Sequence, residues 1–179
     1  MAAGELQIEI VAFAGLPAAV RDEVLELCTA AYDEPFAEIL AAVGPGVHLL
    51  GRLEGQLVAH AMWVTRWLQP QGRPPLRTAY VEAVATLPAQ QGRGFASALL
   101  RRLAREIDDH DLAALSPSDE GFYARLGWQS WRGPLSIRRD GQFEATPDEG
   151  VMILRLPRTP ADLDLDAPLS AEWRPGEVW

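Results

Sequence analysis

A single carboxylate interrupts an otherwise apolar, strand-like segment of the sequence. Glu82 is the ionisable side chain within the apolar run at residues 80–87. A carboxylate in apolar surroundings is costly unless it is solvated or paired. Such a group is a candidate general base; the alternative is a charge at a strand edge that points to solvent.

A small-residue turn follows this strand and opens a helix. The turn reads Gln91-Gly92-Arg93-Gly94-Phe95-Ala96, and apolar residues then recur every four positions through Ile107. A helix start presents unpaired backbone N–H groups and the positive end of the helix dipole. Glycine lets an anion approach the backbone closely. The segment therefore predicts a seat for a phosphate or pyrophosphate between a strand and a helix.

Two common nucleotide motifs do not fit this turn. A dinucleotide fingerprint needs G-x-G-x-x-G, whereas the six residues from Gly92 end in Ser97. A P-loop needs Gly-Lys-Ser/Thr, which is absent from the sequence. A glycine-containing turn with no ligand is the remaining alternative.

Composition favours an ordinary globular protein with a cationic ligand. The chain has 179 residues, 48% hydrophobic and 23% charged, with a net charge of −9. This length suits one domain with a sizeable core. The negative charge argues against nucleic acid as a partner. The N-terminus lacks a signal-peptide pattern, and no apolar run is long enough for a membrane span, so we expect a cytoplasmic protein with no membrane partner.

The elements expected along the chain alternate between helix and strand in a mixed α/β order. We expect strands at 7–13, 47–53, 56–68, 77–86, 112–115, 128–137 and 151–156, and helices at 16–31, 36–43, 95–108 and 119–126. Residues 139–150 are expected to form a polar loop. The segment from 157 is rich in proline and aspartate but contains Trp173 and Trp179, which favours docking over disorder.

Several residues that could do chemistry are interpreted as structural. Cys28 has helical spacing with apolar neighbours, which indicates a buried thiol. His48 and His60 lie in the two hairpin strands and are expected to be structural. The polar run at 108–111 is expected to be solvated, with no metal site. Three tryptophans could form a wall for a sugar or could pack in the core: Trp63, Trp67 and Trp131.

The turn at 91–96 resembles motif A of the GCN5-related N-acetyltransferases, Gln/Arg-x-x-Gly-x-Gly/Ala. In that family the turn holds the pyrophosphate of acetyl-coenzyme A, which implies acetyl-CoA here, bound by Gln91, Gly92, Arg93, Gly94, Phe95 and Ala96. The resemblance implies a single α/β GNAT domain over 1–179, with a docked C-terminal tail at about 157–179. Its mixed central sheet would have flanking helices and would splay between the fourth and fifth strands. The fourth strand of the family pairs with the pantetheine arm, through residues that match Val84, Ala85 and Thr86.

The resemblance also supplies a candidate general acid. In that family the segment Tyr-x-x-x-Gly-Phe/Trp carries a general-acid tyrosine, and residues 123–128 fit it, with Tyr123 at the start. A tyrosine is protonated near neutral pH, so it can donate to a departing thiolate. The alternative for Tyr123 is core packing with a satisfied hydroxyl.

From about residue 77 onward the chain resembles the aminoglycoside 2′-N-acetyltransferases. The matching segments include Tyr80-Val81-Glu82-Ala83-Val84-Ala85, Ala114-Leu115-Ser116, Thr146-Pro147-Asp148 and the ending Trp173-Arg174-Pro175-Gly176-Glu177-Val178-Trp179. The resemblance implies that the substrate-binding residues are Glu82, Ala83, Ser116, Asp148, Glu149, Glu177 and Trp179, the last through its terminal carboxylate. A cleft with several carboxylates complements a polycation such as an aminoglycoside.

The function expected from this resemblance is acetyl transfer to the 2′-amine of aminoglycosides, with Glu82 as a water-mediated base. The family also implies a possible homodimer. Pro35 stands where the family has an aspartate, and the N-terminal third shows little specific resemblance. Two alternatives therefore stay open: an acetyltransferase for another cationic amine, such as a polyamine, peptide or cell-wall amine, and a non-catalytic module that binds CoA or aminoglycosides.

Overall fold

The computed structural model describes residues 4–176, 178 and 179, which form two compact units. Unit 1 contains the described residues up to 64 and residues 81–103; unit 2 contains the others. Three elements continue along the chain from one unit into the other: strands β3 (Gln56–Pro70) and β4 (Leu76–Thr86), and helix α3 (Phe95–Glu106).

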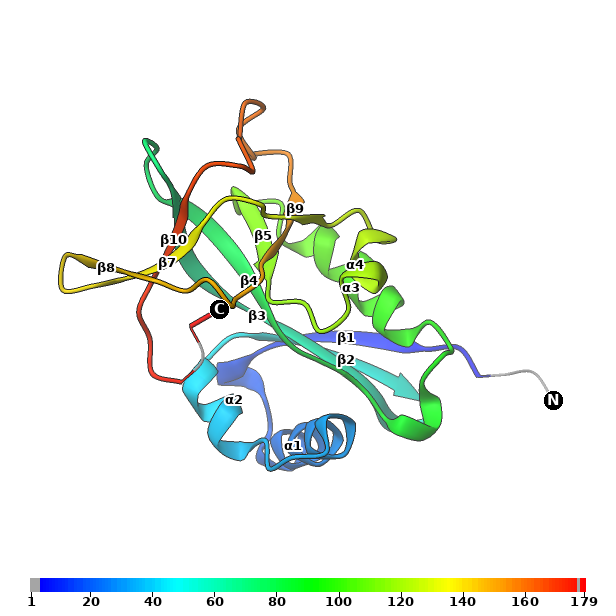
Figure 1. Ribbon diagram of the computed structural model, residues 1–179. Helices are drawn as coiled ribbons and strands as arrows, with labels where there is room; N and C mark the ends of the chain where they lie inside the picture. Colours follow the sequence, from blue (N-terminus) through cyan, green and yellow to red (C-terminus); the bar gives the residue numbers. More distant parts are fainter. Residues whose placement is uncertain (1–3, 177) are drawn as a thin grey trace. The chain divides into compact units, whose positions relative to one another are not determined.

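Unit 1 is built on an antiparallel sheet whose strands β1, β2 and β3 are neighbours in that order. Its other elements are β1 (Gln7–Ala12), the 3-10 helix η1 (Phe13–Gly15), α1 (Ala18–Tyr32), α2 (Ala37–Val43), β2 (Val47–Leu53) and the 3-10 helix η2 (Pro88–Gln90). Glu54 and Gly55 have φ values of 50° and 86° and form the tight turn of the predicted hairpin. Figure 1 shows α1 and α2 on one side of β1 and β2, with α3 on the other.

A small buried polar cluster lies within the core of unit 1. His48 on β2 and His60 on β3 are almost fully buried, and Nδ1 of His48 lies 2.9 Å from Nε2 of His60. Burial lowers the pKa of both histidines, that of His60 to about 3, so both are neutral near pH 7. Cys28 on α1 is buried beside His60, and burial raises the pKa of its thiol to about 12. The thiol is thus buried, as the sequence indicates, and is a poor nucleophile.

Unit 2 contains the remaining strands, in the order β6-β9-β5-β4-β3-β10-β7-β8. These elements are β5 (Leu112–Leu115), α4 (Glu120–Ala124), β6 (Gln129–Ser130), β7 (Leu135–Arg139), β8 (Gln142–Ala145), β9 (Met152–Arg155) and β10 (Leu169–Glu172). β5 is buried along its whole length because it pairs in parallel with β4 on one edge and antiparallel with β9 on the other. The parallel pairing of β4 with β5 extends only from Thr78 to Tyr80 on β4. The mixed α/β class predicted from the sequence is confirmed.

The expected strand at 128–137 is wrong, because two separate strands occupy this segment. β6 pairs with β9, whereas β7 pairs with β8 and β10. Between β6 and β7 the chain passes close to the tail: the N–H groups of Arg132 and Gly133 both donate to the Leu165 carbonyl. A Cβ on Gly133 would lie 2.0 Å from the Ala167 carbonyl oxygen, so only glycine fits there.

Two segments that we expected to be irregular contain strands. The expected loop at 139–150 begins with a hairpin that turns at Asp140 and Gly141, φ 50° and 75°. The four residues of β8 are all exposed, so the segment lacks the alternation that marks a half-buried strand. In the tail, β10 pairs with β7 in parallel and with β3 antiparallel, and long-range hydrogen bonds therefore create this strand.

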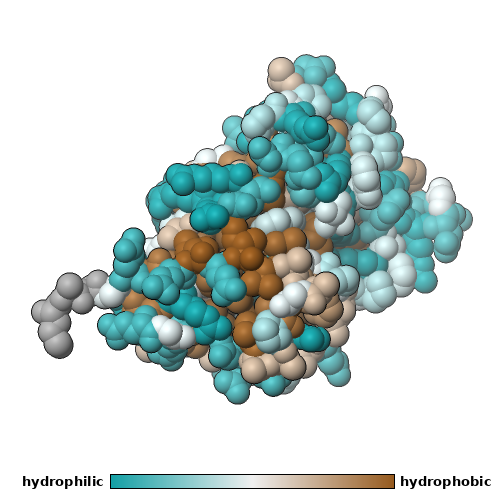
Figure 2. Space-filling model, turned by 180° about the vertical axis from the view of Figure 1, so that it is seen from behind, coloured by the Kyte–Doolittle hydropathy of each residue, from teal (hydrophilic) through white to brown (hydrophobic). Residues whose placement is uncertain are grey.

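Most of the face shown in Figure 2 is hydrophilic, around an area where hydrophobic residues gather. Among the described residues, no helix is both long enough and apolar enough to cross a membrane. Trp63 and Trp131 are buried and belong to the cores of their units, whereas Trp67 is 46% exposed. A sugar-binding wall made of all three tryptophans is therefore not formed.

We expect Gly133→Ala to destabilise the protein by about 2 kcal/mol or more, because the new methyl group must displace the backbone at Ala167. Gly150→Ala is the matched control, since a Cβ there meets no atom within 4 Å. Urea denaturation of both variants measures the difference. Equal midpoints for the two variants would contradict the close packing of this segment.

The neutral histidine pair makes stability depend on pH. In the unfolded chain the pKa of His60 returns from about 3 to about 6.5, so the unfolded state binds protons first. The contribution of the neutral histidines to the free energy of unfolding is therefore fully present above about pH 6.5. It decreases as the pH falls toward 3, by up to about 1.4 kcal/mol per pH unit for each histidine. Denaturant unfolding between pH 7 and 5 measures this slope. The slope should decrease in His60→Gln, and an unchanged slope would contradict the assignment.

Candidate active site

The turn that we predicted to seat a phosphate lies in unit 1 and leads directly into α3. Gly92 and Gly94 have φ values of 73° and 80°, in the region that favours glycine. The α-helical hydrogen bonding begins with the Ala98 N–H, which donates to the Gly94 carbonyl at 3.0 Å. The amides of the first turn thus precede this bonding and face outward, as at any helix start. They provide the donors that an anionic group requires.

The space around these glycines is open enough for a ligand to approach the backbone. A Cβ built on Gly92 or Gly94 would meet no atom within 4 Å. Arg93 adds a positive charge; its guanidinium stacks 4.7 Å from the Phe95 ring centroid and donates to Gln90 Oε1. Gln91 reaches back to the strand, since its Nε2 lies 3.4 Å from the Thr86 carbonyl oxygen. The residues present therefore fit a pyrophosphate.

Strand β4 contains an unusual backbone conformation beside the predicted base. Ala83 has φ 49°, which is uncommon for any residue other than glycine and costs about 1–2 kcal/mol. Glu82 and Val84 on either side are half-buried, while Ala83 itself is buried. Further along, the Thr86 hydroxyl oxygen is buried with no hydrogen-bond partner among the described residues. This left-handed position at Ala83, hereafter called the bulge, lies between Glu82 and Val84, two residues that the sequence singled out.

Two side chains that we did not predict as functional hold the backbone of this bulge. His60 Nδ1 lies 2.8 Å from the Ala83 carbonyl oxygen, and the Tyr32 hydroxyl donates to the Val84 carbonyl at 3.0 Å. The hairpin register pairs His48 with Met62 and Leu50 with His60, so both histidines lie on the same face. That register could have placed His48 beside His60 from sequence, but the contact with Ala83 could not have been predicted in this way.

Tyr123 lies on the short helix α4 of unit 2. Asp119 caps this helix, since its side chain accepts a hydrogen bond from the Phe122 N–H. Tyr123 is buried against Trp128 in an edge-on arrangement, with ring centroids 6.1 Å apart. Burial, aided by the charge of Asp119, raises the pKa of Tyr123 to about 12. The phenol thus stays protonated throughout the neutral and mildly alkaline range.

The predicted acceptor residues of unit 2 fall into two places. Ser116 is exposed immediately after the carboxyl end of β5. Asp148 and Glu149 are exposed in the loop after β8, and the buried Trp179 donates from Nε1 to Thr146 Oγ1 at 2.9 Å. This hydrogen bond ties the acidic loop to the last described residues. Glu177 lies outside the described residues.

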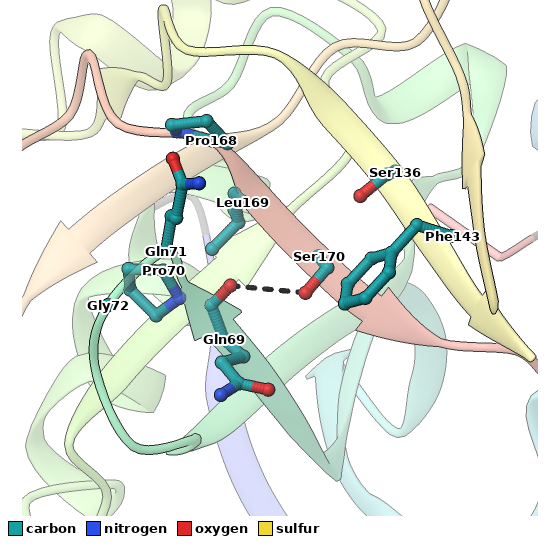
Figure 3. A pocket seen from close by; sticks show the side chains of 9 residues that line it. All are labelled: Gln69, Pro70, Gln71, Gly72, Ser136, Phe143, Pro168, Leu169 and Ser170. Atoms are coloured by element: carbon teal, nitrogen blue, oxygen red, sulfur yellow. Dashed lines mark hydrogen bonds between the residues drawn. The ribbon is translucent and has the colours of Figure 1, made fainter. Parts of the chain in front are cut away.

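The open cavity shown in Figure 3 is a different site within unit 2 and has a volume of about 360 Å³. Residues from β3, β7, β8 and β10 and their flanking segments line it: Gln69, Pro70, Gln71, Gly72, Ser136, Phe143, Pro168, Leu169 and Ser170. None of the predicted site residues is among them. Ser170 Oγ is already engaged with the Gln69 carbonyl and with Arg138, so the cavity offers little unsatisfied polarity.

The polar run at 108–111, which we expected to be solvated, makes defined contacts with its neighbours. Asp109 forms an ion pair with Arg77 at 2.7 Å, and Asp111 accepts a hydrogen bond from the Arg77 N–H. His110 is buried and contacts Thr65. Among the residues that the structure describes, no group of three or more His, Cys, Asp or Glu side chains is placed to hold a metal ion.

The proteins to which this sequence is similar include two acetyltransferases. The chain is 37% identical over 141 residues to the aminoglycoside 2′-N-acetyltransferase of Mycolicibacterium fortuitum, which covers 75% of this chain and 71% of that protein. It is 27% identical over 136 residues to the L-2,4-diaminobutyric acid acetyltransferase of Nocardia farcinica, covering 73% of this chain and 63% of that protein.

Solved structures show the same fold. The GNAT family N-acetyltransferase YhbS from Escherichia coli, in complex with CoA, superposes with a TM-score of 0.64 at 14% identity, over 96% of this chain and 92% of that chain. Other structures with this fold are longer, and this chain covers only 32 to 34% of them. The family model described as an acetyltransferase (GNAT) domain matches residues 21–130, more than half of the sequence. The chain therefore belongs to the GNAT acetyltransferase family.

Proposed function

We propose that this chain transfers the acetyl group of acetyl-CoA to the 2′-amine of aminoglycosides. The observation that carries the proposal is the sequence identity with the aminoglycoside 2′-N-acetyltransferase of Mycolicibacterium fortuitum. The phosphate seat of unit 1 and the acidic loop of unit 2 support it, because one suits an anionic donor and the other a cationic acceptor.

On the donor side, the backbone amides at the start of α3 would hold the pyrophosphate. The left-handed φ of Gly92 and Gly94 and the open space beside them support this role. The strand residues Val84, Ala85 and Thr86 would hold the pantetheine arm. Acetyl-CoA supplies a thioester whose carbonyl carbon forms a new C–N bond with the amine as the C–S bond breaks.

Two groups on β4 would act on the reacting atoms. Glu82 would take the proton of the acceptor ammonium through a water molecule, leaving a neutral, nucleophilic amine. The Val84 N–H would donate to the carbonyl oxygen as negative charge develops on it. We propose these roles because the half-buried residues Glu82 and Val84 directly precede and follow Ala83, the residue with the left-handed conformation.

Tyr123 would protonate the departing thiolate. Its pKa of about 12 keeps the phenol protonated over the pH range in which an amine acceptor can react, so the proton is present when the thiolate departs. The tyrosine would regain its proton from solvent after each turnover.

The acceptor would be recognised mainly by charge. Asp148 and Glu149 supply exposed carboxylates in a loop held by the hydrogen bond between Thr146 and Trp179. An aminoglycoside carries several ammonium groups, which such a loop attracts. Ser116 would add a neutral hydrogen bond.

A second candidate acceptor is a small diamine, and the similarity to the L-2,4-diaminobutyric acid acetyltransferase favours including it. A thiol-release assay with acetyl-CoA separates the possibilities. Kanamycin B carries an amine at the 2′ position, where kanamycin A carries a hydroxyl, so this pair isolates the regiochemistry. We expect turnover with kanamycin B and none with kanamycin A. Equal turnover with both would contradict 2′-specificity, and turnover with 2,4-diaminobutyrate alone would favour the second candidate. Tight binding without thiol release would indicate a non-catalytic module.

Replacing Gly94 with alanine should weaken acetyl-CoA binding. A methyl group at this φ strains the backbone and occupies the space through which the pyrophosphate would approach. We expect KM for acetyl-CoA to increase about tenfold, the equivalent of one lost charge-assisted hydrogen bond. Gly141→Ala is the control, since Gly141 has φ 75° and equally open surroundings in the β7–β8 turn. The seat would be wrong if both variants had the same KM for acetyl-CoA.

Removing one charge from the acidic loop should affect only the cationic acceptor. For Asp148→Asn we expect KM for kanamycin B to increase about two- to fivefold at low salt, as befits an exposed charge. The difference should shrink at high salt, and KM for acetyl-CoA should not change. Asp140→Asn removes the same charge from the nearby hairpin turn and serves as the control. An equal effect of the two substitutions would show that net charge, and not this loop, attracts the acceptor.

A further inference from the structure

A buried histidine of unit 1 contacts the peptide group of β4 that the proposed reaction uses as an oxyanion donor, and a second histidine contacts the first. His60 approaches the Ala83 carbonyl from β3, and His48 approaches His60 from β2. Both rings are almost completely excluded from solvent. Polar groups buried at such a cost are retained where their hydrogen bonds have a role.

The hydrogen-bonding partners fix the tautomers of both rings. A carbonyl oxygen only accepts, so Nδ1 of His60 carries the proton that it shares with Ala83. In a neutral ring the Nε2 of His60 is then an acceptor, and Nδ1 of His48 must be the donor to it. Both hydrogen bonds are therefore donated in the same direction: His48 donates to His60, and His60 donates to the Ala83 carbonyl. Nε2 of His48 has no hydrogen-bond partner among the described residues, so the chain of hydrogen bonds begins at His48.

The Ala83 carbonyl and the Val84 N–H belong to the same peptide group. The described chain contains no cis peptide bond, so this carbonyl and this N–H point in opposite directions. Drawing the carbonyl into the core toward His60 therefore points the Val84 N–H away from the core. A hydrogen bond to the carbonyl also polarises the amide, which makes its N–H a stronger donor, by about 10–30% per bond in such chains.

The same contacts stabilise the strained conformation of Ala83. A left-handed alanine is unfavourable by about 1–2 kcal/mol and persists only where the surroundings hold it. His60 holds the carbonyl of Ala83, and Tyr32 holds the next carbonyl, that of Val84. Two successive carbonyls of the bulge are thus anchored by side chains from β3 and α1.

We propose that His60 is a positioning residue for acetyl transfer, oriented by His48, which aims and polarises the Val84 N–H toward the thioester carbonyl. This inference rests on the proposed role of Val84 and deepens it. His60 touches neither substrate; it acts through the peptide that joins Ala83 to Val84. The role is specific to the donor and is independent of which amine accepts the acetyl group.

Substitution at His60 should separate this role from simple packing. We expect His60→Leu to lower kcat about tenfold to a hundredfold. This decrease is no larger than the decrease in kcat that follows removal of a direct oxyanion donor. KM for acetyl-CoA and for the amine should stay within about threefold, because the lost interaction acts mainly in the transition state. His60→Gln should recover part of kcat, since its amide can still donate to the carbonyl. His48→Leu should cause a smaller decrease.

A matched control is His110→Leu, which removes a buried, hydrogen-bonded histidine from unit 2. We expect it to lower thermal stability while leaving kcat of the folded enzyme unchanged. If His60→Leu lost only stability, as this control should, His60 would be a packing residue and the proposal would be wrong.

Infrared spectroscopy of bound [1-¹³C]acetyl-CoA tests the proposal without any acceptor. The thioester C=O stretch should lie at lower wavenumber in the wild-type complex than in solution, and should return toward the solution value in His60→Leu, which cannot donate to the Ala83 carbonyl. An unchanged stretch in the variant would overturn the proposal. Failure of kanamycin B as a substrate would refute the proposed function alone, since this measurement needs no acceptor. If the variants do not fold, ¹⁵N NMR of the wild-type histidines tests the proposal. Nδ1 of His60 must carry a proton, and an unprotonated Nδ1 would refute the hydrogen bond that His60 donates to the Ala83 carbonyl.

Discussion

The hydrogen bond from His60 to the Ala83 carbonyl is the contact on which the proposed donor site depends. It forms only because Ala83 adopts φ 49°, which turns its carbonyl into the core of unit 1. The same peptide group sets the direction of the Val84 N–H, within the continuous strand β4 that also carries Glu82. An unfavourable backbone conformation and an unfavourable burial of two imidazoles thus stabilise each other, since each satisfies a polar group of the other.

The groups that we propose to bind the two substrates differ in kind and belong to different units. The donor side in unit 1 consists mainly of backbone: the amides at the start of α3 and the strand after the bulge. The acceptor residues described in unit 2 are side chains, with Asp148 and Glu149 exposed on a loop that Thr146 and Trp179 hold. Backbone groups tolerate sequence change while loop carboxylates do not, so the donor can be kept while the acceptor preference shifts.

Local patterns in the sequence predicted much of the fold. The Glu-Gly turn and the alternation around it identified the β2–β3 hairpin, and the spacing of Gly92 and Gly94 identified the turn before α3. The exposed strand β8 has no apolar face to reveal it, and β10 exists because β3 and β7 supply its hydrogen bonds. The contact of His60 with Ala83 could not be predicted from the sequence for a similar reason. Alanine gives no sign of a left-handed conformation, whereas a glycine at this position would have indicated a bulge.

A crystal structure of the protein with acetyl-CoA is the most direct test of this account. We expect the pyrophosphate oxygens within about 3.2 Å of the backbone amides at the start of α3, and the thioester oxygen at a similar distance from the Val84 N–H. The Ala83 carbonyl should still accept the hydrogen bond from His60 in that complex. A pyrophosphate bound elsewhere, or a Val84 N–H directed away from the thioester oxygen, would contradict the account.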